Sequence, residues 1–568
     1  MFSTLPKEYA HYQSWTWEQF KPYADELVNT QLTAENLIAW LTAWSDLSRV
    51  LTEMYTRLYV AITVDTTDQV SKARYNAYLD ELYTPAQMLQ QQCKEKLLAS
   101  GLKPEGMDVP LKHMRAEAEV YCEANLPLLA EEFKLSSEYD EIIGAQTVTY
   151  QGKEYTVKQL EPLYLLPDRA VREQVYRLGA ERQLADREKI NELWTRMMKL
   201  RGEIARNAGL PDYRAYIWKT LHRYDYTPQD CYSFQAAIEQ EVVPAMRRIR
   251  LRRQERLGLD RLCFWDEAVD PFGRAPLKPY QTARELEQKA SAIFHKVDPQ
   301  LGNYFDEMRR QGMLDLENRK GKAPGAYCIS FDMSRQSFIF ENAVGLHDDV
   351  QTVLHEAGHS FHNFESFHLP YHQQLTVGME IAEVASMAME LLAAPYLTAD
   401  QGGYYSPKDA ARARIEHLES LLLFWPYMAV VDAFQHWVYE NHEAASQPEN
   451  CDAKWAELWE RFMVGVDTTG LEDHVRTGWQ RKMHIFQVPF YYIEYGLAQL
   501  GAMQIWRNAI QDQAEAVAAY RRALALGGTA PLPALYAAAG VKFAFDAGTL
   551  GEMVRLAEGV IADLEKVG

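Results

Sequence analysis

Three features of this 568-residue sequence predict a mainly α-helical fold. Long stretches repeat apolar residues at three-and-four spacing between charged residues, as amphipathic helices do. Only two short segments alternate apolar and polar residues in the manner of strands. The regular strand–helix alternation of a parallel-sheet protein is missing, so an α/β fold is not expected.

The helical pattern is clearest in residues 34–60, 168–208, 283–294 and 410–439. The first strand segment, Thr147 to Val157, alternates around Gln151-Gly152 and predicts a hairpin. The second comprises residues 326–331 and 336–344, and predicts another hairpin or two strands of a small sheet.

Composition and charge narrow the classes of function. Lys and Arg total 59 against 79 Asp and Glu, which gives a net charge of −20. Nucleic acid and anionic membranes are not expected as partners, because both require basic surfaces. No apolar run is long enough to span a membrane, and no secretory signal is recognisable. Six scattered cysteines without a CxxC motif predict reduced thiols and a cytoplasmic location.

The strongest chemical signal is HEAGH at residues 355–359, an HExxH motif. In a helix this spacing places His355 and His359 one turn apart on one face, where both imidazoles can bind one zinc ion. Glu356 lies about 100° further around the helix and is placed to act on water as a general base. Apolar residues fill the opposite arc and predict a buried face. The plainer alternative is a surface helix with a solvated histidine stripe.

A catalytic zinc ion needs a third ligand from the protein. A third histidine after a glycine turn is disfavoured, because His362 stands where that pattern has its glycine and Glu365 where it has its histidine. The other source is a glutamate from a second predicted helix, residues 377–392, which carries three candidates on one stripe: Glu380, Glu383 and Glu390. Periodicity alone does not choose among the three.

Residues 484–495 concentrate aromatic and imidazole side chains, namely His484, Tyr491, Tyr492 and Tyr495. Phenol hydroxyls and imidazoles are suitable hydrogen-bond donors to the oxyanion that develops during peptide hydrolysis. The alternative is an aromatic element of the hydrophobic core, since such clusters more often serve packing.

Four segments carry a resemblance to a known family. They are HEAGHSFH, the AEVAS segment around Glu383, KAPGAYC at residues 322–328, and HIFQVPFYYIEYGLAQLGA. Together they resemble the thimet oligopeptidase and oligoendopeptidase F family of zinc peptidases, in particular the shorter Pz-peptidase-like members. The resemblance implies an elongated, mainly helical body with a deep channel and a small β-sheet beside the zinc-binding helices. It further implies that residues 1–205, with the hairpin at 147–157, form a helical channel wall and that residues 206–568 form the catalytic region.

The resemblance also implies roles for individual residues. The implied zinc ligands are His355, His359 and Glu383, with Glu356 as the general base. The implied catalytic donors are His484, Tyr492 and Tyr495, with Tyr491 as a substrate contact able to take one of these roles. The strand at residues 338–344, with Phe338, Phe340 and Asn342, resembles the edge strand on which these enzymes bind an extended peptide.

These observations predict a cytoplasmic endopeptidase with one Zn²⁺ per chain that hydrolyses internal bonds of short peptides. One alternative is a di-iron carboxylate protein, because Glu356-x-x-His359 and Glu365-x-x-His368 both match its Glu-x-x-His pattern. The two copies are too close in sequence to come from facing helices, and His355 is left without a role. The other alternative is a non-catalytic peptide-binding protein of the same fold, against which the intact Glu356 argues.

Overall fold

The protein is described here by a computed structural model covering residues 4–567, with 71% of residues in helices and 5% in strands. This composition confirms the predicted mainly α-helical class. None of the helices in the described part of the chain is both long and apolar enough to cross a membrane.

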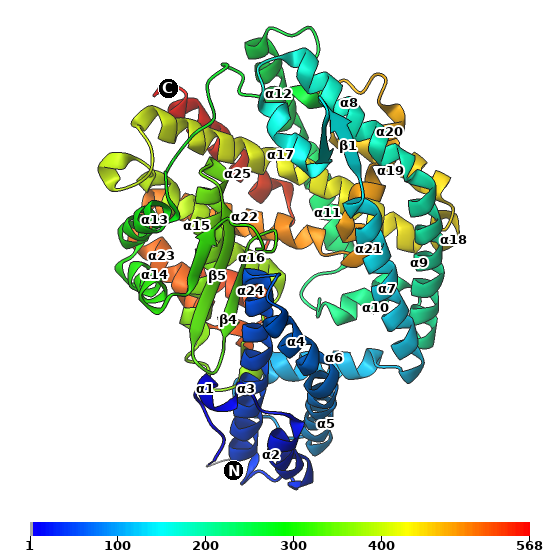
Figure 1. Ribbon diagram of the computed structural model, residues 1–568, viewed down its shortest axis with the longest axis vertical. Helices are drawn as coiled ribbons and strands as arrows, with labels where there is room; N and C mark the ends of the chain where they lie inside the picture. Colours follow the sequence, from blue (N-terminus) through cyan, green and yellow to red (C-terminus); the bar gives the residue numbers. More distant parts are fainter. Residues whose placement is uncertain (1–3, 568) are drawn as a thin grey trace.

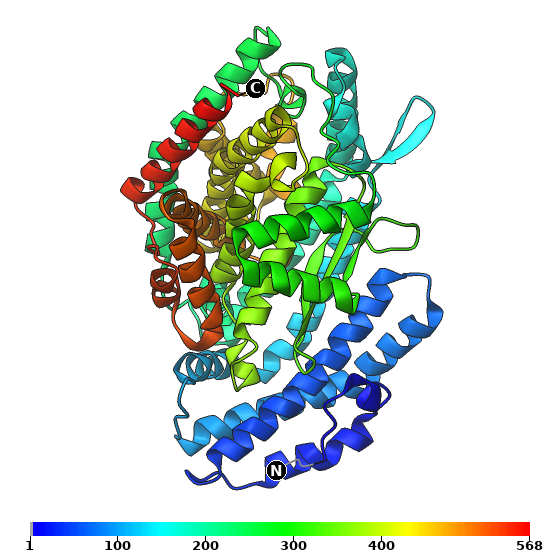
Figure 2. The same ribbon diagram turned by 90° about the vertical axis from the view of Figure 1, so that its left-hand side faces the viewer.

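The first helices form a layer at one end of the molecule (Figures 1 and 2). They are α2 (Trp17–Asn29), α3 (Leu37–Val64), α4 (Gln69–Tyr78), α5 (Thr84–Ser100) and α6 (Asp108–Val120). Their apolar faces enclose a hydrophobic core of their own, in which Phe20, Trp40 and Trp44 are almost completely buried. The Trp40 indole N–H is not lost in this core, because it donates to the Leu27 carbonyl at 2.9 Å.

The larger body that follows is built around one extensive core. Its long helices are α7 (Leu126–Gly144), α8 (Arg169–Ala185), α9 (Arg187–Asn207), α12 (Val243–Leu257), α13 (Ala283–Val297), α14 (Pro299–Gln311), α15 (His347–Ser366), α16 (Met379–Ala393), α17 (Pro407–Glu440), α19 (Pro448–Phe462), α22 (Tyr492–Gln511), α23 (Gln513–Ala525) and α25 (Ala547–Leu564). At the centre of the body, α15 and α22 both pack on α16 (Figure 1). The predicted division of the chain at residue 205 stays a prediction.

The predicted helical stretches are found with shifted ends. Residues 34–60 lie largely in α3, residues 283–294 in α13, and residues 410–439 in α17, which continues through Pro426. The stretch at 168–208 consists of two helices, α8 and α9, which meet at Asp186. Apolar periodicity does not register a break of one residue, so the sequence pattern merged these two helices.

The hairpin predicted around Gln151-Gly152 is present as β1 (Thr147–Tyr150) and β2 (Lys153–Thr156). The φ angles of Gln151 and Gly152 are 50° and 77°, so both turn residues lie in the left-handed region that a two-residue hairpin turn requires. The hairpin projects from the surface of the body (Figure 2).

The second sheet has three strands in the order β3-β5-β4, with β3 (Leu314–Glu317), β4 (Tyr327–Phe331) and β5 (Gln336–Ala343). The antiparallel pair β4–β5 confirms the second predicted hairpin. The expectation that β5 is an edge strand is wrong, because β3 pairs with its other side in parallel. β3 is too short to show a strand pattern in the sequence. The free edge of the sheet near α15 therefore belongs to β4.

The three residues of β5 predicted to contact substrate have other surroundings. Phe338 and Phe340 are 7% and 0% exposed and pack with Phe331 and with Val60 of α3. The Asn342 amide donates at 2.8 Å to each of two carbonyls in the loop before β4. Both rings are core residues that join the sheet to the N-terminal layer, and Asn342 fixes a loop. The predicted substrate contacts of Phe338, Phe340 and Asn342 gain no support from these surroundings and stay predictions.

A glycine inside the HExxH motif sets the distance between α15 and α16. A Cβ atom on Gly358 would lie 2.4 Å from the carbonyl oxygen of Ala385 and 2.6 Å from the Cα of Ser386. Both are backbone atoms of α16, so they cannot move aside as a flexible side chain does. Only glycine permits this separation of the two helices.

We expect Gly358→Ala to lower the thermal stability of the protein, because the added methyl group forces α15 and α16 apart. Overpacking of this kind costs about 1–3 kcal/mol or more. The matched control is Gly559→Ala in α25, where nothing lies within 4 Å of the added atom and alanine favours the helix. Thermal unfolding followed by circular dichroism should give a lower midpoint for Gly358→Ala alone. Equal midpoints for both variants would contradict the close-contact interpretation.

Candidate metal centre and active site

The motif helix α15 is fixed at its start by a buried carboxylate. Asp349 accepts hydrogen bonds from the backbone N–H groups of Val344, Gly345 and Leu346 at 2.9, 2.8 and 2.8 Å. The Tyr280 hydroxyl also donates to this carboxylate. The bond from Leu346, the N-cap residue, caps the start of α15, and the bonds from Val344 and Gly345 join the helix to the end of β5.

The predicted apolar arc of α15 is buried, as the sequence indicated. Val350, Val353, Leu354, Ala357 and Phe361 are all 0% exposed. The two faces of an amphipathic helix point in opposite directions. With its apolar face in the core, the histidine face of α15 is therefore directed toward α16.

Three ligand-type side chains meet between α15 and α16. Atoms of His355, His359 and Glu383 all lie within 4.8 Å of one another. The Oε2 of Glu383 is 3.4 Å from Nε2 of His355 and 3.8 Å from Nε2 of His359. Ligands about 2.0–2.2 Å from a tetrahedral zinc ion are about 3.3–3.6 Å apart, so this set fits one such ion with little adjustment.

The other two glutamates on the stripe of α16 have different partners. Oε1 of Glu390 accepts a hydrogen bond from Nδ1 of His355 at 2.7 Å. Oε2 of Glu390 lies 2.8 Å from Nε2 of His417, a residue of α17. Glu380 accepts from the Tyr226 hydroxyl at 2.7 Å. A carboxylate on the outer nitrogen of a ligating histidine fixes its tautomer and orientation, which is the position of Glu390.

Burial and neighbouring charges shift the pKa values of the two imidazoles in opposite directions. Burial lowers the pKa of His355, but Glu383 and Glu390 outweigh burial and raise this pKa well above its usual value. Burial and the neighbouring His355 lower the pKa of His359 to about 4. The two carboxylates, Glu383 and Glu390, therefore stand against one readily protonated imidazole, His355. The negative charge that remains would suit a bound cation.

Glu356 lies on the side of α15 that faces the sheet. Its side chain is buried, with 8% of the residue exposed. Burial raises the pKa of this carboxyl to about 7, with the nearby charge of His355 acting against the shift and that of Glu383 adding to it. A backbone hydrogen bond at Cys328 of β4 also acts on it, so the carboxyl lies beside the edge strand.

The segment predicted to supply donors comes together as one cluster. The ring centroid of His484 is 6.1 Å from that of Tyr491, 4.9 Å from that of Tyr492 and 6.2 Å from that of Tyr495. Burial, followed by the charge of Lys482, lowers the pKa of His484 to about 4, so its imidazole is neutral at pH 7 and has one N–H to donate.

The three tyrosines differ in what they face. Burial raises the pKa of Tyr491 and of Tyr495, and the charge of Glu383 adds to the shift in both, so both phenols lie near this carboxylate. Tyr492 is 6% exposed and its ring lies 4.2 Å from the Lys482 ammonium. The charge of Glu383 thus acts on Tyr491 and Tyr495, whereas Tyr492 is buried beside Lys482.

Two features of the site were missed in the sequence. His417 belongs to another helix, and no spacing pattern connects it to the motif. In the sequence, Gly358 occupies one of the two variable positions of HExxH, so the motif does not single it out. Ala385 and Ser386, which lie opposite it, are also small. Small residues on two predicted helices would have indicated a close contact.

Comparisons with known proteins agree with this arrangement. The model for Peptidase family M3 matches residues 163–555, and that for the Peptidase M3 N-terminal domain matches residues 8–123. The group B oligopeptidase PepB of Streptococcus agalactiae serotype III (strain NEM316) is 28% identical over 172 residues, 29% of this chain and 27% of that protein. The oligoendopeptidase F homolog of Mycoplasma pneumoniae (strain ATCC 29342 / M129 / Subtype 1) is 22% identical over 411 residues, 68% of this chain and 65% of that protein.

Solved structures resemble the chain over its whole length. A structure described as Pz peptidase A with inhibitor 2 has a TM-score of 0.86 and 28% identity, with 100% of both chains covered. A putative oligoendopeptidase F has a TM-score of 0.84 and 27% identity, with 99% of this chain and 98% of that chain covered. Because the family model spans well over half of the sequence, the chain belongs to peptidase family M3.

Proposed function

We propose that this protein is a zinc-dependent endopeptidase that hydrolyses internal bonds of short peptides. The observation that carries the proposal is the meeting of His355, His359 and Glu383 within 4.8 Å, with the Glu356 carboxyl on the next position of the same helix. Membership of peptidase family M3 supports peptide hydrolysis, and the oligopeptidase and oligoendopeptidase names of the relatives support a preference for short chains.

Two imidazoles and one carboxylate suit zinc, because this donor set is typical of catalytic zinc sites and leaves a fourth position open. A zinc ion held there would polarise the scissile carbonyl and lower the pKa of a bound water. In the mechanism that we propose, Glu356 accepts the proton of the attacking water and passes it to the leaving amine. Its raised pKa, about 7, suits both steps.

Tyr491, Tyr495 and His484 are the proposed donors to the oxyanion of the tetrahedral intermediate. For Tyr491 and Tyr495 this role is supported by the charge of Glu383, which acts on both phenols. The predicted catalytic role of Tyr492 has less support, because its ring is buried beside Lys482.

An extended peptide is the substrate form that suits this site. Within the described sheet β4 has no second partner strand, and it runs beside Glu356, so a substrate strand could pair with it irrespective of sequence. A folded protein has no such free strand to offer. We propose that the N-terminal region forms a wall of the substrate channel, and that the enzyme acts in the cytoplasm.

The di-iron alternative has no support in the surroundings of the second Glu-x-x-His copy. Glu365 accepts from Arg521 at 2.7 Å, and Nδ1 of the exposed His368 is bonded to the Glu365 carbonyl at 2.8 Å. Among the described residues, neither Glu365 nor His368 belongs to a group of three or more ligand-type side chains. A second metal ion bridged by these residues is therefore not expected.

Cleavage of a quenched fluorescent peptide tests the proposed function. We expect a chelator to abolish cleavage, added zinc to restore it, and unfolded casein to be cut far more slowly than short peptides at equal chain concentration.

Glu356→Gln should keep zinc and lose about 10²–10⁴-fold in kcat, because general-base catalysis contributes roughly this factor. More than a tenth of wild-type kcat in this variant would refute the assignment of the base.

Zinc affinity separates the two glutamates of α16 that contact the histidines. Glu383→Ala removes a ligand and should weaken zinc binding most, whereas Glu390→Ala should weaken it by about 10–100-fold, as lost support of a ligating histidine does. Glu365→Ala is the control, since this residue of α15 bonds to Arg521 instead. Metal titration gives the three affinities. A smaller effect for Glu383→Ala than for Glu390→Ala would reverse the assignment.

Removing single hydroxyl groups tests the donors. Tyr491→Phe and Tyr495→Phe should lower kcat by up to about 10²–10³-fold with little change in KM, because an oxyanion donor acts in the transition state. Tyr492→Phe serves as the comparison and should change kcat less. Equal effects of all three substitutions, or effects on KM alone, would favour a packing role for the segment.

A further inference from the structure

Phe490 is a buried residue with an unusual backbone conformation. Its φ is +66°, and it lies in the loop between α21 (Met483–Gln487) and α22. A bulky residue in the left-handed region is energetically unfavourable, and such residues persist only where their surroundings hold them. This loop joins His484 to Tyr491, so its conformation sets the direction in which the tyrosines of α22 point.

Two buried side chains hold the backbone of Phe490 from both sides. Gln435 of α17 accepts the Phe490 N–H on Oε1 at 2.7 Å and donates its amide to the Val431 carbonyl at 3.3 Å. Arg223 donates Nη2 to the Phe490 carbonyl, and the same nitrogen donates to Glu494 in the first turn of α22 at 2.6 Å. Gln435 and Arg223 are 1% and 5% exposed. The two bonds therefore act in a dry environment, where hydrogen bonds are strongest.

The ring of Phe490 is enclosed as well. The centroids of Trp218, His436 and Tyr439 lie 5.5, 5.1 and 5.5 Å from its own. These aromatic contacts fix the side chain while Gln435 and Arg223 fix the backbone, so the loop has few alternative conformations.

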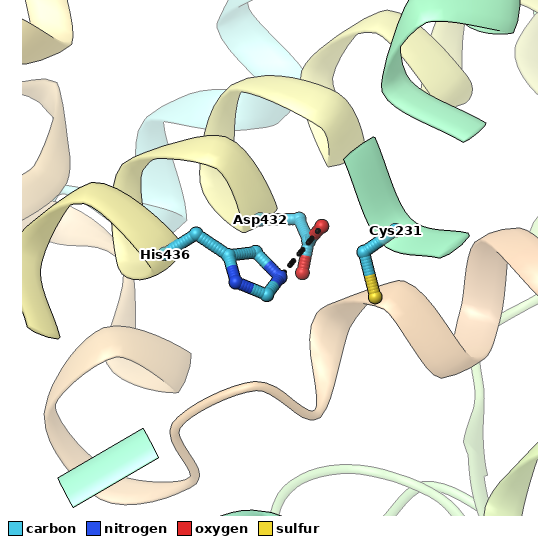
Figure 3. A group of neighbouring side chains, drawn as sticks. All are labelled: Cys231, Asp432 and His436. Carbon is cyan, nitrogen blue, oxygen red and sulfur yellow. Dashed lines mark ion pairs between the residues drawn. The ribbon is translucent and has the colours of Figure 1, made fainter. Parts of the chain in front are cut away.

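His436 also belongs to a buried group with Cys231 and Asp432, whose ligand-type atoms lie within 4.8 Å of one another (Figure 3). Arg214 argues against a metal ion in this group, because its Nη1 lies 3.1 Å from Nδ1 of His436 and a guanidinium only donates. The proton of the neutral imidazole is then on Nε2, which has no lone pair left for a metal. We therefore assign His436 a packing role against the ring of Phe490.

We propose that Gln435 and Arg223 are positioning residues that hold the Phe490 loop and thereby fix Tyr491 and Tyr495, which follow it in the chain. Neither residue contacts the reacting atoms. Each acts through the loop on hydroxyl groups whose catalytic role rests on the proposed function. Small displacements of such groups are costly, because a misplacement of about 1 Å can reduce a rate by roughly 10²-fold.

The test combines two variants with a matched control. Gln435→Met removes the acceptor for Phe490 at nearly constant volume. Arg223→Lys keeps the charge but replaces the planar guanidinium, whose Nη2 donates to both the loop and Glu494, by a shorter side chain. The control is Gln504→Met in α22, since Gln504 is 2% exposed and its amide holds the backbone of Lys542 in the same manner.

Hydrogen exchange of the metal-free chain is the first measurement, because it does not depend on peptidase activity. Gln435→Met and Arg223→Lys should each speed exchange in residues 488–495 at least about tenfold, whereas Gln504→Met should leave this segment unchanged. Unchanged exchange in both loop variants would overturn the proposal, even if the protein proved not to be a peptidase.

Kinetics in two backgrounds is the second measurement. Gln435→Met should lower kcat at least about tenfold with less than a twofold change in KM, and in a Tyr495→Phe background the same substitution should lower kcat much less. Such coupling is expected only if Gln435 acts through the tyrosines. An equal loss in both backgrounds, or an equal loss in Gln504→Met, would show general destabilisation and overturn the proposal.

Discussion

The contact between α15 and α16 at Gly358 is the constraint on which the site depends. With the backbone of α16 about 2.4 Å from where a Cβ would stand, the two helices are as close as their backbones allow. This separation lets a glutamate of α16 reach both imidazoles of α15, at 3.4 and 3.8 Å. A motif on one helix thereby becomes a three-ligand cluster without any contribution from a loop.

Several buried charged side chains surround the two histidines near this contact. Glu383 faces the two imidazoles directly, and Glu390 supports His355 from behind while His417 lies against Glu390. Glu356 stays apart, where burial raises its pKa to about 7. Carboxylates so close together are costly in an apolar interior unless a cation or protons balance them. A divalent ion between the imidazoles would offset this cost, and in the proposed mechanism Glu356 is then left to transfer protons.

The sequence predicted what depends on local periodicity. The helices, both hairpins and the apolar face of α15 follow from spacing alone, and HExxH identified His355, Glu356 and His359. Periodicity could not choose among Glu380, Glu383 and Glu390, because all three share one stripe of a helix. The family resemblance implied Glu383, and the structure has this carboxylate 3.4 and 3.8 Å from the two imidazoles. The short strand β3 was missed for lack of pattern, so β5 was wrongly expected at an edge. The direction of each tyrosine depends on the strained loop at Phe490, which no spacing rule describes.

X-ray diffraction from zinc-soaked crystals, measured on both sides of the zinc absorption edge, tests the central claim most directly. The account predicts one anomalous peak per chain, at about 2.0–2.2 Å from Nε2 of His355, Nε2 of His359 and a carboxylate oxygen of Glu383. It also predicts that Glu390 stays on the outer nitrogen of His355, without contact to the metal. A peak ligated by Glu390 in place of Glu383, two peaks, or no peak between α15 and α16 would contradict it.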